Sequence, residues 1–123
     1  MSYQKLIIIG NIGSDADLRY LPDGTPVCTF SLADSRVVKK GVDETTWFRV
    51  TRFGKQAEVL AQYLLKGASV LVEGRLKPGD GGNPRVYQRK DQSWAASFDV
   101  TADNIQFVGN KKSEQLTDEE VPF

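Results

Sequence analysis

One short segment of the chain places aromatic and basic side chains at alternate positions. The alternating residues are Trp47, Arg49, Thr51 and Phe53. On a β-strand they would share one face, because successive side chains point to opposite sides. Exposed aromatic rings stack on unpaired nucleic-acid bases, and a neighbouring cation contacts phosphates. The segment therefore predicts a surface for single-stranded nucleic acid; the alternative is that Trp47 and Phe53 fill a core and Arg49 lies at its rim.

Other residue types that carry out chemistry are scarce. The chain has one cysteine, Cys28, and no histidine. It therefore lacks an internal disulfide, an imidazole to activate a thiol and the usual ligands of zinc. The acid pairs Asp15 and Asp17, or Asp99 and Asp103, could be the carboxylates of a small hydrolase, but acids so spaced near turns usually cap or solvate loops. We expect a binding protein rather than an enzyme, with no metal and no cofactor.

The length and charge of the chain suit one domain followed by an acidic tail. A chain of 123 residues is long enough for one core of its own. Residues 111–123 hold two lysines and four acids, so 14 of the 16 basic and 12 of the 16 acidic residues remain in 1–110, a net charge of +2. A mildly basic body is compatible with a nucleic-acid partner.

The sequence shows no membrane or export signal. Its longest strongly apolar run, Leu6–Ile9, is far shorter than the ~20 residues of a membrane span and predicts a buried strand. Met1–Lys5 is not the basic start of a secretory signal. We expect a cytoplasmic, nucleoid-associated protein without membrane contact.

Runs of β-branched and aromatic residues, separated by Gly, Pro and Asp, predict a mainly β domain. The expected strands are Tyr3–Ile12 with a continuation at Leu18–Leu21, Val27–Val38, Thr46–Phe53, Ser69–Leu76 and Ala96–Phe107. Cys28, Phe30 and Leu32 should share a buried face, as should Phe98 and Val100. Lys39–Thr45 is expected as a polar loop. Pro78–Pro84 is expected as a hairpin tip or mobile wing from which Arg85–Arg89 returns.

One segment, about Lys55–Lys66, has helical periodicity. Ala57, Leu60, Ala61, Leu64 and Leu65 form an apolar stripe, and Gly67 stands where a left-handed cap would end the helix. Five strands with one helix between the third and fourth strands is the element order of an OB-fold barrel, which binds oligonucleotides on one sheet face and its loops.

From Gly109 onward the apolar periodicity stops, which is typical of a disordered tail. The last residues are Asp118, Glu119, Glu120, Val121, Pro122 and Phe123. One interpretation is a solubilising acidic tail. The other is a peptide ligand, in which Phe123 enters an apolar pocket of a partner, its carboxylate meets a basic residue and the acids steer the approach.

A set of short motifs in this order resembles the bacterial single-stranded DNA-binding protein (SSB) family. They are Gly10–Asp15, Leu18–Tyr20, Phe30–Ala33, Trp47–Val50, Phe53–Lys55, Tyr63–Leu64, Lys66–Gly67, Val72–Leu76 and Ala102–Asn104, and the tip ending Val121-Pro122-Phe123 is similar to the family's partner-docking tail. The resemblance implies an OB-fold domain over residues 1–109 and a flexible tail over 110–123. It also implies a homotetramer that binds single-stranded DNA without sequence preference in replication, recombination and repair, and recruits proteins of those processes through the tip.

The resemblance also assigns roles to individual residues. Trp47 and Phe53 match positions where bases stack. Basic residues near the DNA path are matched by Arg49 and Lys55 and, more loosely, by Lys5, Lys66 and Arg75. Phe48 would lie near a subunit interface or in the core.

The sequence departs from the family pattern in two places. Val37-Val38 stands where many members carry a tryptophan, and the following Lys39-Lys40 would then act through phosphates. The region 77–97 is also unlike the common form: Arg85 could contact DNA there, and Tyr87 and Trp94 either replace a stacking aromatic or pack on the barrel.

The alternatives to an SSB are an OB-fold replication-restart or RNA-binding accessory protein, a small hydrolase, and a scaffold that acts mainly through its tip.

Overall fold

The computed structural model describes residues 1–109, which form seven strands and one α-helix. The strands are β1 (Leu6–Ile12), β2 (Asp17–Tyr20), β3 (Pro26–Lys39), β4 (Val42–Phe53), β5 (Ser69–Leu76), β6 (Arg85–Gln88) and β7 (Trp94–Gly109). The helix is α1 (Lys55–Ala61), and a 3-10 turn covers Asp80–Gly82. No helix among these residues is long and apolar enough to cross a bilayer.

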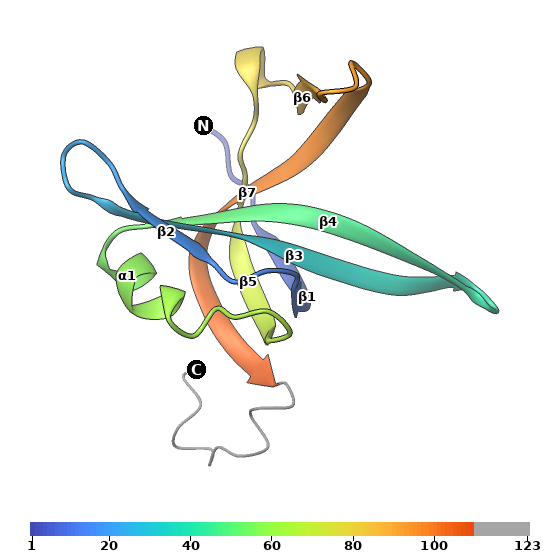
Figure 1. The fold of residues 1–123 in the computed structure, drawn as a ribbon, viewed down its shortest axis with the longest axis horizontal. Helices are drawn as coiled ribbons and strands as arrows, with labels where there is room; N and C mark the ends of the chain where they lie inside the picture. The colour runs from blue at the N-terminus through green and yellow to red at the C-terminus, as the bar shows by residue number, and fades with distance from the viewer. Residues whose placement is uncertain (110–123) are drawn as a thin grey trace.

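Five of the strands close into a barrel in the order β1-β5-β7-β4-β3, and pairing of β3 with β1 completes the ring. β4 and β7 run parallel, whereas the other barrel pairs are antiparallel. β2 extends the sheet beyond β3. The OB-fold prediction is therefore confirmed. Because the predicted first strand is divided into β1 and β2, the helix lies between β4 and β5, as expected from its place in the chain (Figure 1).

Alternation along the strands separates the barrel interior from its surface. Cys28, Phe30 and Leu32 of β3 point inward and are almost fully buried, as predicted. β1 differs from its prediction as a buried strand, since Ile8 is buried but Ile7 and Ile9 are each 59% exposed. A strand with one face on the core leaves every second residue outside, and in β1 two of the three exposed residues are isoleucine and the third is Asn11.

The helix is shorter than predicted. After Ala61 the chain continues in turns, although Leu64 is fully buried as its apolar spacing requires. Tyr63 and Leu64 N–H still donate to the Leu60 carbonyl, but two later donors bond to the end of β1 and the loop after it: Lys66 N–H donates to the Asp15 carboxylate (2.8 Å) and Gly67 N–H to the Ile12 carbonyl (2.8 Å). Gly67 has the expected positive φ, 92°.

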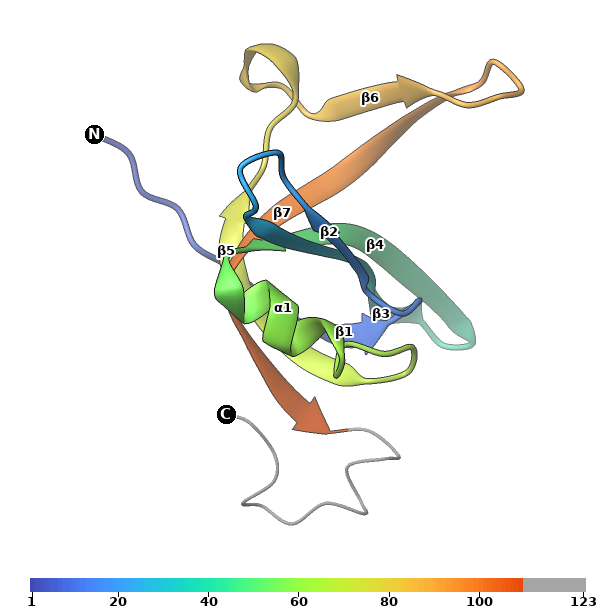
Figure 2. The ribbon, with the colours of Figure 1, turned by 60° about the vertical axis from the view of Figure 1, so that its left-hand side comes forward.

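Two hairpins extend away from the barrel (Figures 1 and 2). β3 and β4 continue through the predicted loop Lys39–Thr45 to a tight turn at Lys40 and Gly41, so that prediction is wrong. Gly41 has φ 78°, which L-residues rarely adopt, and thereby permits the turn.

The second hairpin, the wing, consists of β6 and the beginning of β7. The prediction of a wing is confirmed, but the predicted position of its turn is wrong. β6 pairs with β7, and the chain reverses at residues 89–93 rather than at Pro78–Pro84. Phe98 is 58% exposed, contrary to its predicted burial with Val100. The pairing of β7 with β5 reaches only to Val100, so at Phe98 the strand lies at the end of the barrel, where it pairs only with β4 and its inner face no longer meets the core.

Candidate nucleic-acid interface

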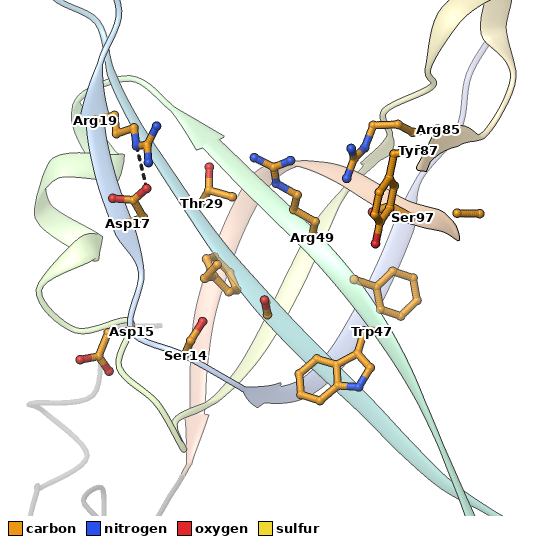
Figure 3. Close-up of a pocket in the computed structure, with 14 residues that line it drawn as sticks. Ser14, Asp15, Asp17, Arg19, Thr29, Trp47, Arg49, Arg85, Tyr87 and Ser97 are labelled. Atoms are coloured by element: carbon orange, nitrogen blue, oxygen red, sulfur yellow. Dashed lines mark hydrogen bonds and ion pairs between the residues drawn. The ribbon is translucent and has the colours of Figure 1, made fainter. Parts of the chain in front are cut away.

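A groove of about 470 Å³ lies between the outer surface of β3 and β4 and the wing. The predicted site residues that line it are Trp47, Arg49, Arg85 and Tyr87. Figure 3 shows them around one space, with Arg49 and Arg85 at the same end and Trp47 at the other. Two segments distant in the sequence, β4 and the wing, thus form a single site.

Trp47 lies open on this surface, with 54% of its side chain exposed. It shares the outer face of β4 with Arg49, and the β3 residues directly opposite these two are Ala33 and Ser31. Such small neighbours leave the indole and guanidinium standing above the sheet. Behind the indole, a Cβ added to Gly13 would lie 2.5 Å from ring atom Cζ3, so the ring occupies space that only a glycine leaves free.

Phe53 and Lys55 lie beyond the groove. Phe53 ends β4, opposite Val27, and is 37% exposed. Lys55 is exposed at the first position of α1. These residues extend the aromatic and basic surface past the groove, along the same strand that carries Trp47.

The wing contributes a cation held in place by two contacts. Arg85 Nε donates to Asp99 Oδ2 at 2.8 Å, and the guanidinium carbon lies 4.9 Å from the centre of the Tyr87 ring. Ser97 also donates to Asp99. In the β6–β7 register Trp94 lies opposite Gln88, on the other face of the wing from Arg85 and Tyr87. Trp94 therefore does not join the groove, although it is 69% exposed.

The groove also holds carboxylates, each with a partner. Asp17 pairs with Arg19 at 2.7 Å, and Asp15 accepts the Lys66 backbone N–H described above. Asp99 and Asp103, the second pair of acids considered for a hydrolase, have different partners. Asp99 bonds Arg85, whereas Asp103 lies 3.8 Å from Arg75. Within residues 1–109 no group of three or more His, Cys, Asp or Glu side chains could hold a metal ion.

The remaining predicted cations lie away from the groove. Lys5 pairs with Glu73 at 2.8 Å, which raises the pKa of Lys5 and lowers the pKa of Glu73. Arg75 faces Asp103, and Lys66 is exposed in the turns after α1. Lys5 would have to release the Glu73 carboxylate before its ammonium group could bind a phosphate.

The remaining residues singled out in the sequence lie at the end of a hairpin, against the core or outside the described residues. Lys39 and Lys40 are exposed at the end of the β3–β4 hairpin. Phe48 is partly buried against the core, with its ring centre 5.7 Å from that of Phe98. The predicted tip, Asp118–Phe123, lies outside the described residues.

Sequence reasoning missed three residues of the site. Arg19 lines the groove from β2, Gly13 lies behind Trp47, and Asp99 holds Arg85. Asp99 carried a signal: it interrupts an apolar strand where an unpaired buried charge would be costly, so a basic partner was required. Gly13 and Arg19 gave no such signal, because their roles depend on contacts distant in sequence.

Comparison with known proteins decides the family. The model of the single-strand binding protein family matches residues 3–108. This chain belongs to that family. A protein of Neisseria meningitidis serogroup A named single-stranded DNA-binding protein is 36% identical to it over 115 residues, and one of the same name from Helicobacter hepaticus is 39% identical over 117 residues.

These relatives differ from the chain in length. The chain spans 63% of the Neisseria protein and 64% of the Helicobacter protein, with 90% of its own residues aligned in each case. A Thermotoga maritima protein of the same name is 34% identical over 122 residues, and there the chain spans 82% of the relative. Membership of the single-strand binding protein family confirms the resemblance predicted from the motifs and agrees with the barrel of Figure 1.

Proposed function

We propose that this chain binds single-stranded DNA without sequence preference, as a stoichiometric binding protein and not as an enzyme. The observation that carries the proposal is the open surface of β4 in the groove, where Trp47 stands exposed beside Arg49. Stacking contributes about 1–3 kcal/mol per base and every base has a flat face, so such a surface binds without reading sequence. The names of the relatives support DNA as the polymer.

The proposed DNA path begins at Trp47 and Arg49 and runs along β4 to Phe53 and Lys55. Arg85 and Tyr87 form its opposite wall. The remaining proposed contacts are Lys5, Lys39, Lys40, Lys66, Arg75 and Trp94, all of which lie outside the groove. These residues would act only where a longer strand leaves it.

A titration with thymidine oligomers of graded length tests this function. The tryptophan emission should be quenched as the oligomers stack on Trp47, and the affinity should rise with length until the path is filled. Raising the salt concentration should weaken binding, because phosphate contacts release counterions. Duplex DNA of equal length is the matched control and should bind poorly, since its bases are already stacked. Equal affinity for duplex and single strand would contradict the proposal.

The second candidate is an RNA-binding accessory protein. Stacking on Trp47 does not in itself distinguish the two polymers, since only contacts with the 2′-hydroxyl do so. Competition between thymidine and uridine oligomers of equal length decides between them. Displacement of the DNA by equimolar RNA would favour the accessory role.

We also propose that the chain assembles into a homotetramer. Two exposed isoleucines, Ile7 and Ile9, lie side by side on the outer face of β1 and are suited to contact another copy. Sedimentation equilibrium measures the mass directly. A monomer at micromolar concentration would contradict the assembly but not DNA binding.

Residues 110–123 are proposed to form a separate tail whose tip, 118–123, docks proteins of replication, recombination and repair. Support comes from the composition of the segment, acids followed by an apolar aromatic end. Deletion of 118–123 should leave the affinity for thymidine oligomers within about twofold while abolishing recruitment of such proteins to DNA coated by this chain. A large loss of DNA affinity would contradict this division of roles.

A cytoplasmic, nucleoid-associated location follows from the proposed binding of single-stranded DNA.

A further inference from the structure

Asp99 is an unusual residue for the wall of a DNA-binding groove. Its side chain is only 9% exposed, and one carboxylate oxygen accepts a hydrogen bond from Arg85 Nε at 2.8 Å. The other oxygen accepts the Ser97 hydroxyl. In the parallel pairing of β4 with β7, Asp99 lies directly opposite Arg49. A single, nearly buried carboxylate therefore bonds one of these two arginines and lies on the neighbouring strand directly opposite the other.

The contact with Arg85 uses only part of its guanidinium. Bonding through Nε leaves the Nη1 and Nη2 groups available, and these can bind an anion such as phosphate with two parallel hydrogen bonds. The ring of Tyr87 lies beneath the same guanidinium at 4.9 Å and limits its rotation. Figure 3 shows Arg85 and Arg49 reaching into the same end of the groove.

We propose that Asp99 is a positioning residue, which holds Arg85 so that Arg85 and Arg49 together grip one backbone phosphate of the bound strand. The inference rests on the proposed function and adds a phosphate subsite at a defined place. The strand would then cross the groove with this phosphate between the arginines and a neighbouring base towards Trp47.

Substitution of Asp99 by asparagine separates this role from a simple charge effect, because the two predict opposite signs. If Asp99 were only a nearby negative charge, its removal would strengthen binding of DNA and steepen the salt dependence. If Asp99 positions Arg85, its removal weakens binding even though the protein becomes more positive. The salt dependence then becomes shallower, because one cation no longer meets its phosphate.

The experiment measures the affinity for a thymidine oligomer at several salt concentrations. For Asp99→Asn we expect about a tenfold loss, which corresponds to about 1.4 kcal/mol, and a slope of log K against log[salt] smaller by about 0.7. In a double-mutant cycle with Arg85→Gln, the two losses should not add. Asp103→Asn is the matched control, since it also removes one acid paired with an arginine but lies outside the groove; its binding should be unchanged or slightly tighter.

Unchanged or tighter binding by Asp99→Asn would overturn the inference, as would losses that add in the cycle. Thermal unfolding of each variant shows whether the barrel remains folded. If Asp99→Asn does not fold, Arg85→Lys provides the test, because lysine keeps the charge but lacks the Nε and Nη groups. A loss of about tenfold is again expected, and wild-type affinity would reject the subsite. Failure of the wild-type protein to bind the oligomer would instead reject the proposed function.

Discussion

The indole of Trp47 packs against Gly13, in the loop between β1 and β2, so closely that a methyl group on Gly13 would lie 2.5 Å from Cζ3 and 2.8 Å from Cη2. Carbon atoms separated by so little repel each other strongly, and one of them has to move. The loop therefore fixes where the indole lies above β4. A side chain larger than hydrogen at position 13 should therefore move the ring.

Gly13→Ala should displace the Trp47 ring and weaken binding of thymidine oligomers, by up to the ~1–3 kcal/mol that one stacked base contributes. The substitution is best made in a Trp94→Phe background, since the chain has two tryptophans and the emission then reports Trp47 alone. We expect a shifted emission maximum in the free protein and a lower affinity. An unaltered spectrum and affinity would show that the loop moves instead of the ring and therefore does not fix its position.

Trp47→Ala and Trp94→Ala should differ in their effect on short oligomers. Trp47 lies in the groove and its loss should weaken binding by about 1–3 kcal/mol, whereas Trp94 lies on the other face of the wing. A strand that fills only the groove cannot reach Trp94, so Trp94→Ala should matter only for oligomers long enough to pass the wing. Equal losses with the shortest oligomer that binds would contradict this arrangement.

The lysines at the end of the β3–β4 hairpin should act through charge alone. In the double variant Lys39→Gln and Lys40→Gln, the slope of log K against log[salt] for a long oligomer should fall by about 1.4, which is 0.7 for each lost phosphate contact on single strands. Thymidine and adenosine oligomers should be affected alike. A slope equal to that of the unaltered protein would place the DNA path away from this hairpin.

Cys28 should be unreactive in the folded protein. Its side chain is fully buried, and burial, with a smaller contribution from the charge of Asp17, raises its pKa to about 11. At pH 8 the reactive thiolate is therefore rare and also inaccessible. Iodoacetamide should label Cys28 only in urea, as mass spectrometry would show. Rapid labelling in the absence of denaturant would indicate that the barrel opens at β3.

Leu64 should anchor the turns that follow α1. It is fully buried, so Leu64→Ala should lower the free energy of unfolding by about 2–5 kcal/mol. Val59→Ala, at an exposed position of the helix, is the control and should change it by less than about 0.5 kcal/mol. Urea unfolding followed by circular dichroism measures both values. Similar values for the two variants would argue against a fixed segment after Ala61.

The features that the sequence predicted well are those governed by local periodicity. Alternation along β4 placed Trp47 and Arg49 on one face, and the same alternation placed Cys28, Phe30 and Leu32 in the core. In these strands the relation between neighbouring residues does not depend on which partner strand lies beside them. Helical spacing likewise located α1 and the burial of Leu64.

The errors arose where distant segments decide the outcome. Nothing in Arg85–Gln88 indicates whether it pairs with the strand before or after it, so local pattern does not locate the turn of its hairpin. Phe98 follows the same alternation as Val100, but β5 no longer pairs with β7 there. After α1, Lys66 and Gly67 donate to Asp15 and Ile12, which are distant in sequence, so helical spacing alone could not locate the end of the helix. Likewise, the ion pair of Asp99 with Arg85 becomes visible only once the wing is folded.

The position of β7 in the sheet has a consequence for synthesis of the chain. β7 lies between β5 and β4 in the barrel, although it is the last described strand to leave the ribosome. Until residues 94–109 have emerged, β4 and β5 each have an edge without a neighbour, and open edges readily pair with other chains. A nascent polypeptide stalled before Trp94 should therefore be prone to aggregation and should gain protease resistance only when β7 becomes available.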